Sequence, residues 1–119
     1  MVIKMKHEMK LQPKYYNFIL NGTKRIELRL FDEKRQMINI ADTIIFLKEP
    51  DLKESFEVKV VELLKYDSFD LLFEEFDISL LADKSMTKTE LKEELEKYYT
   101  KEQQQIYGVL GIRVELCKK

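Results

Sequence analysis

NGTKRIELR, residues 21–29, decides the fold, because a helix ends within it and a strand begins. Before it, Pro13 suits the first turn of a helix, and apolar residues follow at helical spacing. Gly22 supplies the stop, since glycine adopts a positive φ without a steric penalty. After Lys24 the pattern alternates, with apolar residues at 26, 28 and 30 and charged residues between them. The change of period predicts a helix over residues 13–21 followed directly by a strand.

Four more segments on either side of this stretch have the alternation or the short apolar runs typical of strands. They lie at residues 3–11, 43–48, 56–60 and 109–116. The polar residues 31–41 between them predict an irregular connection.

Two further helices are expected, over residues 68–77 and 88–99. The second has the clearest start, because Thr87 and Glu90 have the spacing of a capping box. A shorter helix is expected to begin after Thr100 and to end before Gly108. The order of strands and helices predicts an α+β fold with a mixed, barrel-like sheet of five or six strands and peripheral helices.

The composition fits one soluble domain over residues 1–119. With 21 basic and 22 acidic residues the net charge is −1, which argues against a protein that coats nucleic acid through bulk positive charge. No apolar run approaches the roughly 18 residues that span a bilayer, and residues 1–10 do not resemble a signal peptide, so we expect a cytoplasmic protein that does not bind membranes. One histidine and one cysteine, Cys117, cannot form a zinc site or an internal disulfide, and we expect no metal or cofactor.

Charged side chains that could form a site lie on the polar face of the second strand. If the apolar residues face the core, Glu27 and Arg29 both point the other way, about 7 Å apart, with Lys24 at the start of the same surface. Arginine can hold a phosphate with two hydrogen bonds, lysine can act as a point charge or a base, and glutamate can accept from a base amino group or move a proton. The alternative is an ordinary solvated strand face.

The spacing G-x-K-x-x-E-x-R, formed by Gly22, Lys24, Glu27 and Arg29, resembles the signature of ASCH domains. Residues 7–11, 40–44 and 107–112 are similar to that family's first strand, the turn before its third strand and its last strand. This resemblance implies a PUA-like β-barrel that binds RNA or a nucleotide in a cleft between barrel and helices. Ala41 stands where the family commonly has glycine, which leaves the shape of that turn open.

Some members of the family are enzymes, and whether this chain is one remains open. In the small acetylcytidine amidohydrolases, the catalytic lysine matches Lys24. The position of their catalytic threonine is Glu27 here, and their catalytic glutamate falls near Lys84. Another branch is reported to include ribonucleases. If the chain is a hydrolase acting on a modified nucleoside or on RNA, Lys24 and Glu27 are its expected catalytic residues.

Three functions therefore remain open: binding of RNA or a nucleotide, hydrolysis, and protein interaction. Residues 14–35 hold six basic side chains against three acidic ones, which favours the first two. Lys24, Glu27 and Arg29 are the expected ligand-binding residues, together with Tyr15, which can stack on a base, and Arg35, which can reach a phosphate. The sequence leaves the ligand, the oligomeric state and the pathway open.

Overall fold

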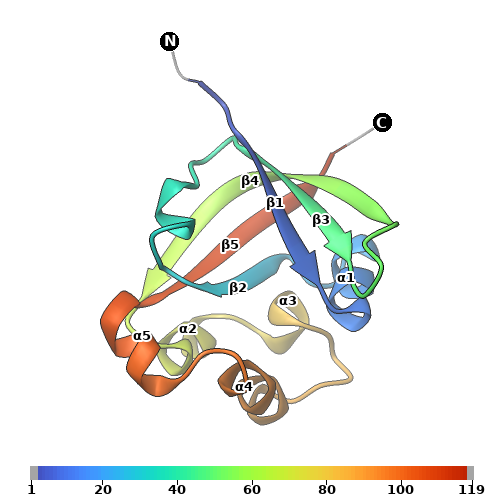
Figure 1. The fold of residues 1–119 in the computed structure, drawn as a ribbon. Helices are drawn as coiled ribbons and strands as arrows, with labels where there is room; N and C mark the ends of the chain where they lie inside the picture. The colour runs from blue at the N-terminus through green and yellow to red at the C-terminus, as the bar shows by residue number, and fades with distance from the viewer. Residues whose placement is uncertain (1–2, 118–119) are drawn as a thin grey trace.

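Five strands form one mixed sheet in the computed structural model of the protein, which describes residues 3–117. The strands follow the order β1-β3-β4-β5-β2, in which β1 and β3 are parallel and all other neighbours are antiparallel. Their bounds are Lys6–Leu11 (β1), Ile26–Leu30 (β2), Thr43–Lys48 (β3), Ser55–Tyr66 (β4) and Val109–Leu116 (β5). The sheet curls until its two edge strands, β1 and β2, approach each other (Figure 1). This half-barrel confirms the predicted fold class.

The helices gather mainly on one side of the sheet. Helices α2 to α5 lie together beside β2, whereas α1 lies near the ends of β1 and β3 (Figure 1). The helices have the bounds Pro13–Leu20 (α1), Phe69–Glu75 (α2), Ile78–Leu81 (α3), Lys88–Glu96 (α4) and Lys101–Tyr107 (α5), and a 3₁₀ turn (η1) covers Arg35–Met37. None of the helices in residues 3–117 has the length and apolar character needed to cross a membrane.

The predicted helices are all present, but the one expected to reach residue 77 ends at Glu75, because Phe76 has an extended backbone. The helix expected to reach residue 99, α4, ends at Glu96. Thr100 has the extended backbone of an N-cap for α5, so the helical conformation of α4 must end before residue 100. The short helix α3 was not predicted, since its four residues are too few to give a periodic pattern.

The turn before β3 keeps a conformation that favours glycine. Ala41 has a φ of 79°, in the left-handed region that glycine adopts readily, although alanine carries a Cβ atom that disfavours it. The next residue, Asp42, is 1% exposed and accepts hydrogen bonds from the backbone N–H groups of Met5 and Asn39. Its second oxygen also lies 2.8 Å from Nε2 of His7. His7 is therefore a hydrogen-bonded residue that fastens β1 to this turn.

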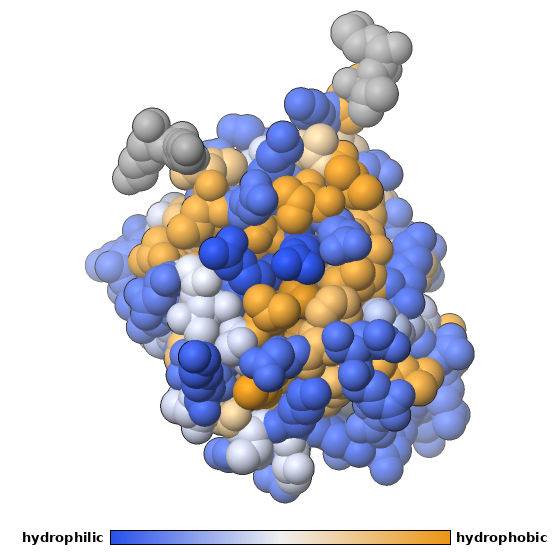
Figure 2. Space-filling view, turned by 180° about the vertical axis from the view of Figure 1, so that it is seen from behind, coloured by the Kyte–Doolittle hydropathy of each residue, from blue (hydrophilic) through white to orange (hydrophobic). Residues whose placement is uncertain are grey.

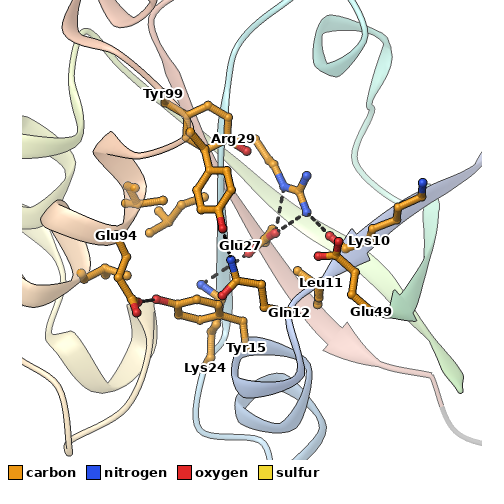
Figure 3. Close-up of a pocket in the computed structure, with 14 residues that line it drawn as sticks. Lys10, Leu11, Gln12, Tyr15, Lys24, Glu27, Arg29, Glu49, Glu94 and Tyr99 are labelled. Carbon is orange, nitrogen blue, oxygen red and sulfur yellow. Dashed lines mark hydrogen bonds and ion pairs between the residues drawn. The ribbon is translucent and has the colours of Figure 1, made fainter. Parts of the chain in front are cut away.

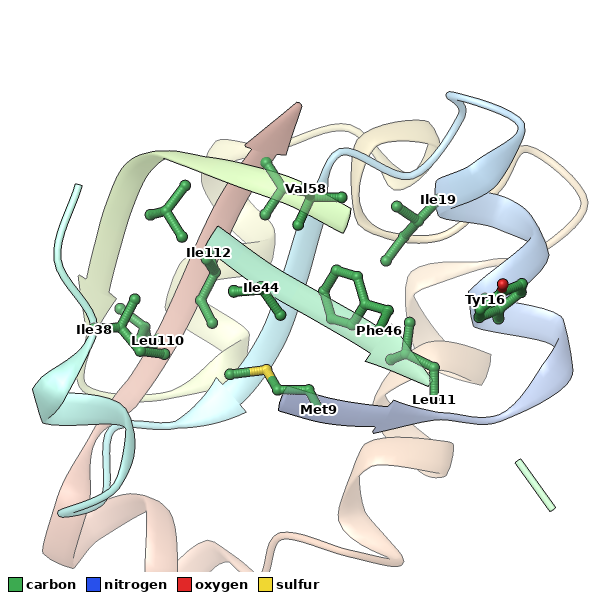
Figure 4. Close-up of a cluster of buried hydrophobic side chains, with 12 residues drawn as sticks. Met9, Leu11, Tyr16, Ile19, Ile38, Ile44, Phe46, Val58, Leu110 and Ile112 are labelled. Atoms are coloured by element: carbon green, nitrogen blue, oxygen red, sulfur yellow. The ribbon is translucent and has the colours of Figure 1, made fainter. Parts of the chain in front are cut away.

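Two apolar clusters stabilise the fold, one on each face of the sheet. The inner cluster fills the hollow of the curled sheet and combines β1, β3, β4 and β5 with Tyr16 and Ile19 of α1 (Figure 4). The outer cluster lies between β2 and helices α2 to α4, and the apolar residues of β2 at 26, 28 and 30 belong to it. The charged residues of β2 consequently point to the hollow side, where Glu27 and Arg29 lie opposite Ile112 and Leu110 of β5.

Some large apolar side chains reach the surface. Seen from behind, they gather in the middle and upper part of the molecule, between polar side chains (Figure 2). Among all large apolar side chains in residues 3–117, Ile3 and Ile106 are the most exposed, whichever face they lie on.

The capping box at the start of α4 supports a first prediction. Thr87 accepts from the N–H of Glu90 at 3.1 Å, and the Glu90 carboxylate accepts from the N–H of Thr87 at 3.1 Å. Replacing Thr87 with alanine removes one of these two bonds and should lower the free energy of unfolding by about 0.5–2 kcal/mol in a urea titration. Thr89→Ala, two residues further along the same helix and exposed, is the matched control. Equal unfolding curves for the two variants would contradict a role for the cap.

Candidate functional site

A cavity of about 290 Å³ lies where β1 and β2 approach each other. One wall comes from β1 and α1, the other from β2, and α4 with the residues after it forms the cover (Figure 3). Its polar and aromatic lining residues are Lys10, Gln12, Tyr15, Lys24, Glu27, Arg29, Glu49, Glu94, Tyr98 and Tyr99. The motif residues Lys24, Glu27 and Arg29 therefore meet at one cavity with aromatic rings beside them.

Lys24, Glu27 and Arg29 form a buried ion network at the inner end of the cavity. Lys24 and Glu27 are only 2% and 5% exposed. Nζ of Lys24 donates to the backbone carbonyls of Ile26 and Leu81, each at 2.6 Å, and lies 3.5 Å from Oε1 of Glu27. Nε of Arg29 donates to Oε2 of Glu27 at 2.8 Å, and Nη2 of Arg29 is 2.8 Å from the same oxygen. The Lys24 ammonium thus has two hydrogen-bond acceptors and an ion-pair partner.

Burial and the neighbouring charges shift all three pKa values. Burial lowers the pKa of Lys24, although Glu27 acts in the opposite direction. Burial alone would raise the pKa of Glu27, but Arg29 and Lys24 outweigh it, so that the pKa is lowered. Burial likewise opposes the charge of Arg29, and Glu27 more than offsets it and raises the pKa. Glu27 is therefore a carboxylate at neutral pH, held between two cations.

Arg29 also connects the two edge strands of the sheet. Its Nη2 donates to the backbone carbonyl of Lys10 in β1 at 2.9 Å. Since β1 and β2 are not paired through their backbones, this side chain supplies a hydrogen bond to an otherwise free strand edge. The ion network therefore has a structural role, whatever binds in the cavity.

The cover of the cavity is fastened by polar contacts between α1 and α4. The hydroxyl of Tyr15 donates to Oε2 of Glu94, and Nζ of Lys14 donates to both oxygens of that carboxylate, at 2.8 and 3.1 Å. Gln12 donates through its side-chain amide to the hydroxyl of Tyr98. Tyr98 is 59% exposed, so its ring stands at the mouth of the cavity.

The cavity is balanced in charge, contrary to what the local basic excess suggested. Three basic and three acidic side chains line it: Lys10, Lys24 and Arg29, and Glu27, Glu49 and Glu94. Other basic residues of segment 14–35 do not line the cavity. Lys14 pairs with Glu94, and the side chain of Arg25 donates to the carbonyl of Gly22. The residues that line the cavity therefore do not carry the excess of basic side chains seen in the sequence.

The candidate residues from the sequence divide into two groups. Lys24, Glu27, Arg29 and Tyr15 line the cavity. Arg35 does not, because it pairs with Asp32 at 3.1 Å in the connection after β2. Lys84 is exposed in the loop before α4 and also lies outside the cavity lining.

Sequence reasoning missed the residues that α4 and the segment after it contribute. Glu94, Tyr98 and Tyr99 are about 70 residues from the motif, and no local pattern connects them to it. The sequence offers one signal, the adjacent tyrosines Tyr98 and Tyr99 at the end of the helix expected over residues 88–99, whose periodicity would place Tyr98 on the buried face. Its exposure corrects that expectation, because the helix ends before it.

Comparisons with known proteins agree with the fold and the motif. The ASCH domain family model matches residues 9–118. A crystal structure of the hypothetical protein PH0355 is 35% identical, with a TM-score of 0.83 over 94% of this chain and 99% of that one. A solution structure of protein PF0455 from Pyrococcus furiosus is 27% identical, with a TM-score of 0.73 over 96% of this chain and 99% of that one. No curated protein matches the sequence. The chain belongs to the ASCH domain family.

Proposed function

We propose that this ASCH domain binds RNA or a nucleotide by accepting one base into the cavity between β1, β2 and α4. The observation that carries the proposal is a charge-balanced cavity whose cover and walls include three tyrosines, Tyr15, Tyr98 and Tyr99. Every nucleobase has a flat π face, and stacking on an aromatic side chain binds single-stranded nucleic acid with little regard to sequence. The volume of about 290 Å³ lies at the small end of ligand-binding clefts, which suits one base better than a longer segment.

A phosphate is a poor candidate for the interior of the cavity. The lysine there donates to two carbonyls and contacts Glu27, so binding an anion would leave these buried acceptors without a donor. A phosphate would also enter beside the carboxylates of Glu27 and Glu49, against repulsion. An uncharged base, with donors and acceptors at its edge, neither takes Lys24 from its carbonyl acceptors nor is repelled by the carboxylates.

Binding is tested with labelled single-stranded RNA in a fluorescence anisotropy titration. Tyr98→Ala should weaken binding by about fivefold or more, as expected when one stacking platform is lost. The exposed position of Tyr98 means that the fold should tolerate the change. Tyr107→Ala is the matched control, because Tyr107 is also partly exposed but lies outside this cavity. Equal affinities of the two variants, or no binding of any RNA or nucleotide at low salt, would contradict the proposal.

Hydrolysis is the second candidate, and the lowered pKa of Lys24 beside Glu27 favours it. A buried lysine that loses its proton within a cavity can act as a base or a nucleophile. Its two hydrogen bonds to carbonyls count against this role, because a nucleophile needs a free lone pair directed at the substrate. Incubation with acetylated cytidine and with short RNA tests the alternative. Turnover that rises with pH as Lys24 loses its proton would support hydrolysis, and absence of product would exclude these two substrates.

A further inference from the structure

We infer that Lys14 and Tyr15 form a phosphate subsite at the mouth of the cavity, and that Glu94 occupies this subsite when no ligand is bound. The inference rests on the proposed function, because it concerns the phosphate of a nucleotide whose base lies in the cavity. It assigns to Glu94 the role of an internal competitor for that phosphate.

Three hydrogen bonds converge on the Glu94 carboxylate from the opposite wall. Two come from the Lys14 ammonium, and the third comes from the Tyr15 hydroxyl. The ammonium also lies 5.2 Å from the centre of the Tyr15 ring, so the two donors are held together. An ammonium and a hydroxyl directed at the same point are suited to a phosphate as well as to a carboxylate, since both are anions with acceptor oxygens.

Lys14 is the cation best placed for a phosphate outside the cavity. Lys24 and Arg29 are committed to the buried network and to backbone carbonyls. Lys10 lines the cavity but directs its ammonium away from it (Figure 3). The side chains of Lys14 and Glu94 remain 42% and 32% exposed, so an incoming anion can reach this pair from solvent.

Exchange of Glu94 for a phosphate has two consequences. The first is that the parent protein prefers phosphorylated ligands only weakly. The phosphate replaces the Glu94 carboxylate on the same donors, so the net gain in binding free energy is small. The second is a looser attachment of α4 to α1, since Lys14 and Tyr15 no longer bind Glu94 while the hydrogen bond from Gln12 to Tyr98 remains. The cover of the cavity then responds to whether the ligand carries a phosphate.

The inference is tested with a nucleoside and its 5′- and 3′-monophosphates, titrated calorimetrically into the parent protein and three variants. Glu94→Gln should raise the preference for a monophosphate over the nucleoside by about fivefold or more, because Lys14 no longer has a competing carboxylate. Adding Lys14→Gln to this variant should remove the gain. Glu93→Gln is the control, since it makes the same change in net charge at an exposed position on the same helix.

The outcomes separate the subsite from the proposed function. An unchanged phosphate preference in Glu94→Gln, with nucleoside binding retained, would overturn the subsite alone. An equal increase in Glu93→Gln would also overturn it, because general electrostatics would then explain the effect. Absence of nucleoside and nucleotide binding by the parent protein would overturn both. Thermal melting of each variant establishes that the fold is intact, and binding is compared at a temperature where all four proteins are folded.

Discussion

Lys24→Met is expected to lower the free energy of unfolding by about 3–5 kcal/mol, because it breaks a buried ion pair by removing one partner. Methionine fills similar space but has no hydrogens to donate. The carbonyls of Ile26 and Leu81, each 2.6 Å from the ammonium, would lose their donor, and Glu27 would keep only Arg29 as a counter-charge. Since Ile26 belongs to β2 and Leu81 to α3, the change also removes the ammonium that bridges this strand and this helix.

Urea unfolding followed by circular dichroism measures this effect. Lys6→Met is the matched control, because Lys6 forms only a loose ion pair with Glu57 at 3.8 Å and its side chain is 68% exposed. The control should unfold much like the parent protein. A loss below about 1 kcal/mol for Lys24→Met would mean that the buried ammonium contributes little to the fold. In that case its burial would have to be explained by chemistry in the cavity, and hydrolysis would become the stronger candidate.

The order of elements could be predicted because each one has a local signal. The stop at Gly22, the alternation after Lys24 and the capping box at Thr87 each depend on neighbouring residues alone. The order of strands and helices predicted the mixed, barrel-like sheet. Helix α3, Ile78–Leu81, is too short to show the repeated i, i+3, i+4 spacing of an amphipathic helix, so the sequence does not predict it. It nevertheless supplies the Leu81 carbonyl that accepts from Lys24.

The cavity could be predicted only in part, because its two walls come from distant segments. The motif places Lys24, Glu27 and Arg29 on one side of a strand, and the structure brings them to one cavity. The motif does not indicate how deeply these three side chains are buried. Burial on both sides of β2 depends on α4 and on β1, whose positions relative to β2 are set by long-range packing. For this reason Lys24 and Arg29 make internal hydrogen bonds, which the pattern of a solvated strand face does not predict.

Glu27→Gln should have an effect as large as that of Lys24→Met, with a distinctive dependence on pH. The amide has nearly the same shape, but it leaves Lys24 and Arg29 buried without a counter-charge, which should cost about 3–5 kcal/mol at neutral pH. Glu57→Gln, in a partly exposed ion pair, is the control and should change little. A small loss for Glu27→Gln at neutral pH would show that the two cations do not need the carboxylate.

The pH dependence follows from the lowered pKa of Glu27 in the folded state. The carboxylate contributes its stability in full above the unfolded pKa of about 4.3, and loses it as the pH falls through the lower folded value. Glutamine does not titrate, so its unfolding free energy should lack this component of the acid dependence. The difference between parent and Glu27→Gln should therefore be largest at neutral pH and shrink as the pH falls below about 4. A difference that stays constant from neutral to acid pH would mean that Glu27 has the same pKa in the folded and unfolded protein, so that Arg29 and Lys24 do not stabilise its charge.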